Sequence, residues 1–267
     1  IASRLLATLL VAGLPCTILS PDGLTTNGDL TALDNQFAIL SGDDTDQRVV
    51  RIPLEKIQRI TADNAPSRLP PEESLRIALV DDSQLTLKQL TMENGIMTLS
   101  PWSGPTQPLP RTAIRSVRFG SSSDEKDQQW NEIANDEHAG DTLVIRKEDS
   151  LDYLDGVVMG IDDDSVLFNY DGDEIPVKQT KLEGILFFQS ARTESALSEP
   201  TMDVALAGGS RLKGEKLSLK GEYFRILTLA GVEWRIPIAE VATIDFGVGR
   251  TLFLSDVEPA TLTVTPQ

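Results

Sequence analysis

A short apolar string that contains proline recurs four times along the chain. It reads Ile52-Pro53-Leu54, Leu109-Pro110, Ile175-Pro176-Val177 and Ile236-Pro237-Ile238, and its prolines are 57, 66 and 61 residues apart. Further apolar residues follow each proline at the fourth and seventh positions, or two positions later in the third copy. A pattern that returns at this interval predicts internal repeats of one small unit.

The residues after each proline predict one helical turn followed by a strand. In the second copy, Ile114 and Val117 are three residues apart, which is the spacing of one helical or 3₁₀ turn laid on a core. Phe119 follows Val117 after a step of two, which is typical of a strand. Because proline has no N–H for a β-ladder, we expect each proline at a strand end or a sheet edge.

Upstream of each proline, apolar and polar residues alternate as they do in half-buried strands. In the third copy one face is predicted to hold five apolar residues, interrupted by Asp155: Leu151, Tyr153, Val157, Met159 and Ile161. The cluster Asp162-Asp163-Asp164-Ser165 then turns the chain into the next strand. In the first copy the corresponding apolar positions are Leu30–Leu33, Phe37–Leu40, Val50, Ile52 and Leu54.

Each copy therefore holds about five short strands with one helical turn before the last, the element order of SH3-like or Sm-like small barrels. We predict an all-β protein of four tandem small β-barrel-like units. A unit of about 45 residues buries too little surface to be stable alone, so the units should pack in pairs or as an array. The predicted segments are a signal peptide at 1–20, β units at 21–62, 75–120, 141–190 and 201–248, a polar linker at 121–140, and a lead-in to a further module at 249–267.

The N-terminal segment has the features of a signal peptide. Arg4 precedes about ten mostly apolar residues, a stretch that matches the apolar core of such a peptide and is too short to span a bilayer comfortably. We therefore expect an exported protein with no membrane span after signal removal, and Cys16 would be lost with the peptide. The alternative is that this stretch is a buried first strand or helix.

Charge narrows the range of partners. The chain has 24 Lys and Arg residues against 41 Asp and Glu residues, a formal net charge of −17. Such a surface repels phosphate backbones, so nucleic acid is not an expected partner. The simplest reading of the acidic balance is solubility.

Candidate residues for chemistry are few, and no catalytic, cofactor or metal site is expected. Acidic clusters such as 43–46, 162–164 and 171–174 lack the ligand spacing of a calcium loop, so ordinary β-turns are favoured. The segment 207–210 indicates a hairpin turn rather than a phosphate-binding loop. The single histidine, His138, is expected to be a solvated residue of the polar linker.

Two tryptophans are candidate ligand-facing residues. Trp102 lies in a loop rich in proline and glycine, and Trp130 lies in the polar linker beside Ile133, where one short helix is possible. An exposed tryptophan can stack on a sugar ring or anchor a protein partner. The alternative is that the ring covers the end of a barrel. For Trp102 both interpretations stay open, and for Trp130 the covering role is favoured.

The third copy resembles a known repeat segment. The stretches 141–147, 151–158, 175–178 and 182–185 are similar to a repeat in large exported bacterial proteins, which often continue into an NPCBM-type module, a β-sandwich associated with carbohydrate binding. The segment 252–260 resembles the lead-in to that module, so we expect the module itself to lie beyond Gln267. The resemblance implies an exported protein and a glycan-related context, and it brings no site residues.

These observations favour a non-enzymatic interaction or scaffold protein outside the cytoplasm, with a protein or a glycan as its partner. A carbohydrate-binding accessory region is the second hypothesis, based on Trp102 and the C-terminal resemblance. A hydrolase that uses only carboxylates is the third and weakest hypothesis, because 41 acidic residues give many pairs without a recognisable pattern.

Overall fold

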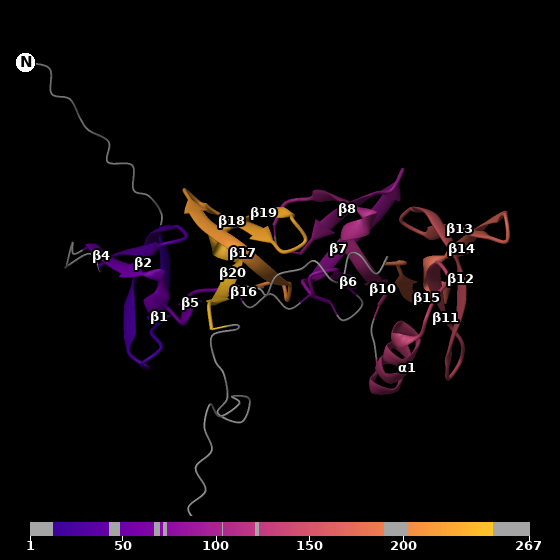
Figure 1. Ribbon diagram of the computed structural model, residues 1–267, viewed down its shortest axis with the longest axis horizontal. Helices are drawn as coiled ribbons and strands as arrows, with labels where there is room; N and C mark the ends of the chain where they lie inside the picture. The colour runs from indigo at the N-terminus through magenta and orange to yellow at the C-terminus, as the bar shows by residue number, and fades with distance from the viewer. Residues whose placement is uncertain are drawn as a thin grey trace, which may run out of the picture.

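The computed structural model describes residues 13–42, 49–66, 70–71, 74–102, 104–120, 123–189 and 202–247. Within this part of the chain, twenty antiparallel strands are connected by hydrogen bonds into one sheet, and a single α-helix lies beside them (Figure 1). The predicted all-β class is confirmed. None of the described helices has the length and apolar character needed to cross a bilayer. The predicted lead-in at 249–267 lies outside the described residues.

The same order of elements occurs four times, and we name each group a unit. Every unit has four strands, a three-residue 3₁₀ helix and a fifth strand. Unit 1 comprises β1 Leu14–Leu19, β2 Thr25–Leu33, β3 Phe37–Ser41, β4 Val49–Pro53, η1 Leu54–Lys56 and β5 Arg59–Ala62. Unit 2 comprises β6 Leu75–Leu79, β7 Gln84–Glu93, β8 Ile96–Pro101, β9 Gln107–Pro110, η2 Arg111–Ala113 and β10 Ile114–Arg118.

The second half of the chain repeats this order after a helix. The helix α1, Asp124–Asn135, lies in the predicted polar linker around Trp130 and Ile133. Unit 3 comprises β11 Asp141–Arg146, β12 Leu151–Ile161, β13 Ser165–Tyr170, β14 Asp173–Lys178, η3 Gln179–Lys181 and β15 Leu182–Leu186. Unit 4 comprises β16 Met202–Leu206, β17 Arg211–Lys220, β18 Tyr223–Thr228, β19 Glu233–Pro237, η4 Ile238–Glu240 and β20 Val241–Asp245.

Strands pair in the same order inside each unit. The first strand lies between the fifth and the second, and the third and fourth strands follow as a meander, as shown by β1 with its neighbours β5 and β2. Each fourth strand contains proline, at Pro53, Pro110, Pro176 and Pro237. Because proline donates no hydrogen bond, these strands are suited to the edge position that they occupy.

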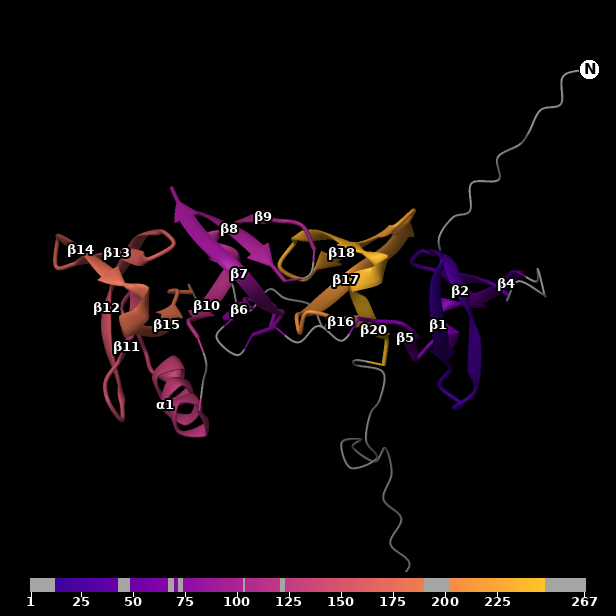
Figure 2. The same cartoon turned by 180° about the vertical axis from the view of Figure 1, so that it is seen from behind.

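The units do not follow one another in space as they do in sequence. Fifth strands join unit 1 to unit 4 through β5 and β20, and unit 2 to unit 3 through β10 and β15. The resulting pairs meet between units 4 and 2, where Arg211 of β17 pairs with Gln84 of β7. The spatial order is therefore 1–4–2–3, an elongated array built from two pairs (Figures 1 and 2).

The spacing of three that predicted a helical turn has a different cause. The 3₁₀ helices occupy the three residues before the first apolar position, so Ile114 and Val117 both belong to β10. The ladder with β6 skips Arg115, and this β-bulge turns both Ile114 and Val117 toward the core. The helical turn is present in every unit, but the apolar spacing reports the bulge that follows it.

A bulge also overturns the predicted face of β12. Its pairing with β13 skips Met159, so Val158 and Ile161 are buried while Val157 and Met159 are exposed. A regular alternation would have placed Val157, Met159 and Ile161 on one side. The extra residue reverses the side on which the following residues lie.

The predicted signal peptide cannot extend to residue 20 without damage to unit 1. Residues Leu14–Leu19 form β1, whose Leu14, Cys16 and Ile18 side chains are buried in the core. The strand pairs with both β2 and β5, so its removal would open the sheet on two sides. A leader that leaves unit 1 intact has to end before Leu14, and Cys16 is a core residue of the folded unit.

Candidate functional site

The helix α1 is fixed to the sheet where units 2 and 3 join. Ser123 caps its first turn by accepting a hydrogen bond from the Lys126 amide, and Trp130 and Ile133 are buried against Val144. Gly184 of β15 permits this contact. A Cβ atom there would lie 2.7 Å from the Trp130 ring and 2.3 Å from the Val117 carbonyl oxygen, so a side chain would push the helix away.

A buried ionic network supports the same junction. Glu183, which is fully buried, accepts hydrogen bonds from Arg118 at 2.6 Å and from Arg146 at 2.9 Å. Arg118 also donates to Asp127 of α1, and its guanidinium carbon lies 4.8 Å from the centre of the Trp130 ring. Glu183 sits at the bulge of β15, the position that the β11 ladder skips. The network therefore connects β10, β11, β15 and the helix.

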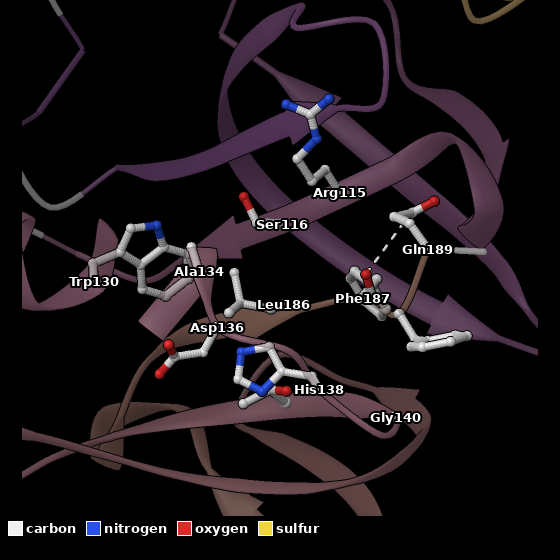
Figure 3. A pocket seen from close by; sticks show the side chains of 12 residues that line it. Arg115, Ser116, Trp130, Ala134, Asp136, His138, Gly140, Leu186, Phe187 and Gln189 are labelled. Carbon is white, nitrogen blue, oxygen red and sulfur yellow. Dashed lines mark hydrogen bonds between the residues drawn. The ribbon is translucent and has the colours of Figure 1, made fainter. Parts of the chain in front are cut away.

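Beside the helix lies a cleft of about 290 Å³. Figure 3 shows Trp130 and Ala134 of α1 on one side of it and Phe187 and Gln189, which follow β15, on the other. Its wall is completed by β10, by the segment after the helix and by β11. The lining residues are Arg115, Ser116, Trp130, Ala134, Asp136, His138, Gly140, Thr142, Leu186, Phe187, Phe188 and Gln189.

His138 is part of this wall and not the solvated residue that the sequence predicted. Its side chain is only 11% exposed, and its Nε2 atom lies 2.7 Å from the Ile133 carbonyl oxygen. Because a carbonyl oxygen only accepts, Nε2 carries a proton. Nδ1 lies 3.1 Å from an Asp155 carboxylate oxygen, and Tyr153 packs edge-on against the ring. His138 thereby closes the C-terminal end of α1 and connects it to β12.

A buried aspartate fixes the opposite rim of the cleft. Asp141 accepts hydrogen bonds from the backbone amides of Val158 and Phe188, at 2.9 and 3.0 Å, and from the Arg111 side chain at 2.6 Å. The Phe188 side chain is 52% exposed, whereas the neighbouring Phe187 is buried. The rim therefore presents an exposed aromatic ring on a backbone that is held in place.

Several polar groups of the wall, Arg115 and Gln189 among them, are held by structural partners. Arg115 donates to Asp82 and to the Val80 carbonyl oxygen, and Gln189 donates to the Ile114 carbonyl oxygen at 2.8 Å. Asp136 is the one carboxylate among the described lining residues. A cleft with an aromatic rim, an apolar floor and fixed polar groups is suited to noncovalent binding.

The structure does not bring the two predicted tryptophans together. Trp130 reaches the cleft from α1, but most of its ring is covered by the sheet. Trp102 lies at the end of β8 and is half-buried; its indole N–H donates to the Leu87 carbonyl oxygen at 3.1 Å, and the Lys88 ammonium lies 5.2 Å from its ring centre.

Sequence reasoning missed Phe188 and Asp141. Phe187 is buried, and a second aromatic directly after it has to face the other way as the strand ends. That adjacency was the available signal for Phe188. Asp141 offered none, because its burial depends on contacts with β12 and η2 that lie far away in sequence.

The acidic turns are supported locally. Asp162 accepts hydrogen bonds from the Asp164 and Ser165 amides, and these bonds lower the pKa of its carboxyl group. Asp171 and Gly172 have positive φ angles in the turn between β13 and β14. The cluster at 43–46 lies outside the described residues.

No protein-family model matches the chain, and a comparison with curated proteins finds no match.

Proposed function

We propose that this chain is an exported, non-enzymatic interaction scaffold, made of four small barrel-like units, that holds a protein partner at the cleft beside α1. The observation that carries the proposal is Phe188. A large exposed aromatic ring on a fixed backbone, at the rim of a cleft, is the arrangement of a binding anchor. Its backbone is already ordered by Asp141, so little conformational entropy is lost on binding.

The position of the cleft supports this assignment. Units 1 and 4 join through fifth strands in the same way as units 2 and 3, yet α1 is packed only at the junction of units 2 and 3. Among the described residues, the helix and the Glu183 network are thus found at one of two similar junctions, and the cleft lies beside them.

Photo-crosslinking tests the proposal. Phe188 is replaced by a photo-reactive phenylalanine analogue in cells that naturally produce the protein, and Ile96, an exposed apolar residue of unit 2, is replaced in a matched control. A discrete protein adduct at position 188 that is missing at position 96 is expected. It should be lost when Ala134→Trp fills the cleft. Identical adducts at both positions, or none at either, would contradict the proposal.

The carbohydrate-binding alternative rests on Trp102 and on the family resemblance. Lys88 lies over the Trp102 ring, which reduces the area available for stacking on a sugar. Binding of the purified chain to immobilised glycans, with loss of that binding in Trp102→Ala but not in Phe188→Ala, would favour the alternative.

A further inference from the structure

The two end units expose more large apolar residues than the inner units do. Of the eleven large apolar residues that are exposed in the described part of the chain, three belong to unit 1 and six to unit 3, whereas unit 4 has none. A skew of this kind indicates surface that is covered by a partner. The arrangement of the units shows which partner fits.

The junction between units 4 and 2 shows how two such faces are covered. Ser83 accepts a hydrogen bond from the Lys213 amide at 2.9 Å, and Ser210 accepts one from the Thr86 amide at 3.0 Å. Each serine ends the turn between the first and second strands of its own unit and accepts a hydrogen bond from the second strand of the other unit. Both serines are buried, so this contact is dry.

The fourth strands meet at the same junction. Gln107 of β9 donates to the Glu233 carbonyl oxygen of β19 at 2.8 Å, and the adjacent Trp234 is only 1% exposed. Gln107 and Trp234 both stand three residues before the proline that begins the 3₁₀ helix. This position on the fourth strand thus belongs to the covered face of the inner units.

In the end units the same position is open. The residue three places before the N-cap of the 3₁₀ helix is Val50 in unit 1 and Ile175 in unit 3, and these side chains are 37% and 41% exposed. Each is opposite a buried residue of the third strand, Leu40 or Phe168, so each belongs to an edge of the core. β4 and β14 lie at opposite ends of the long axis (Figures 1 and 2).

We infer that unit 1 of one chain docks on unit 3 of a second copy, by the kind of contact that joins units 4 and 2. Each added chain continues the alternation of fifth-strand junctions and turn junctions. The contact joins two different faces, so it is heterologous and produces an open linear assembly rather than a closed dimer. A net charge of −17 on every chain opposes this association, so it strengthens with ionic strength.

Sedimentation velocity on the full chain, over a range of concentrations at low and high salt, tests the inference. We expect species that grow with concentration and grow further at high salt. Val50→Glu and Ile175→Glu should each remain monomeric. An equimolar mixture of these two variants should stop at dimers, because each variant keeps one intact face. Ile96→Glu, a change at an exposed apolar residue of unit 2, should assemble like the wild type.

Folding of the variants is checked by circular dichroism. Val50→Gln and Ile175→Gln, which are smaller changes at the same two positions, replace any variant that fails to fold. A wild-type chain that stays monomeric at all concentrations and salts would overturn the inference. Dimers formed by Val50→Glu alone would overturn it equally, because they would show that unit 3 pairs with itself.

Discussion

Glu183 is a buried carboxylate that accepts hydrogen bonds from two guanidinium groups. A buried ion pair contributes little net stability when it is complete, but removal of one partner leaves a buried charge without compensation. Glu183→Gln should therefore destabilise the chain by about 3 kcal/mol, measured from the shift in the urea unfolding midpoint. Glu233→Gln is the matched control, because Glu233 forms an exposed pair with Arg225 at 3.8 Å that is worth less than about 1 kcal/mol. Equal effects of the two substitutions would show that Glu183 does not hold the junction.

The Asp162 turn makes stability depend on pH in a defined direction. Hydrogen bonds from backbone amides lower the pKa of the folded carboxyl group below its unfolded value, so Asp162 stabilises the fold above the unfolded pKa. This contribution is lost as the pH falls through the lowered folded pKa. The wild type should be more stable than Asp162→Ala at pH 7, and the difference should shrink below about pH 4. Urea unfolding at several pH values measures it. Because the hydrogen bonds are local, this pH dependence should persist in 0.5 M salt. Its loss in salt would show that the net charge of the chain causes it instead.

At the scale of elements, the sequence predicted the features that depend on the residues of one strand alone. The fourth strand and its proline could be placed from the repeated string alone, whereas the helical turn was expected at residues that belong to the fifth strand. Met159 and Arg115 could not be recognised as bulge residues, since a bulge is defined by the partner strand. For this reason Ile161 lies on the other side of the sheet from Val157 and Met159, with which it was predicted to share a face.

The strand β1 shows a second limit of prediction from the sequence. An apolar segment near an N-terminus is compatible both with a signal peptide and with a buried strand. Cys16 offers a direct test. Its thiol is buried, and burial, with a smaller contribution from the charge of Asp63, raises its pKa to about 12. Since the thiolate is the reactive form, Cys16 should resist thiol reagents at pH 8 and react only in urea. Labelling followed by absorbance measures this. Rapid labelling without urea would contradict the placement of β1 in the core.

Truncation separates the leader from the strand. A chain that starts at Gly13 keeps β1, and a chain that starts at Pro21 loses the strand between β2 and β5. The shorter chain should lose amide protection at Thr61 of β5, which pairs with Thr17 of β1, whereas the longer chain should keep it; hydrogen exchange measures this. Protection that survives in the chain starting at Pro21 would show that unit 1 does not need β1.

For the whole molecule, the sequence predicted the number of units but not their order in space. Whether the units pack as pairs or as an array is decided by β5, β10, β15 and β20, which find one another across long sequence separations. The same holds for the cleft, since its walls come from units 2 and 3 and from the segment between them. A repeat pattern specifies a unit; side chains at the edges of units, such as Ser83 and Ser210, specify how the units are joined.

These two serines give the whole molecule its sharpest test. Each accepts a hydrogen bond from a buried backbone amide of the other half, so loss of either hydroxyl leaves that amide unpaired, at a cost of about 1–3 kcal/mol. Ser83→Ala should reduce hydrogen-exchange protection at Lys213, and Ser210→Ala should reduce it at Thr86. A substitution in unit 2 should thus reduce protection in unit 4, and a substitution in unit 4 should reduce it in unit 2. The fifth-strand junctions should stay protected, because they share no partner with either serine. Ser218→Ala, on β17 away from the junction, is the control. A loss of protection confined to the substituted unit would mean that the halves are not joined through these turns.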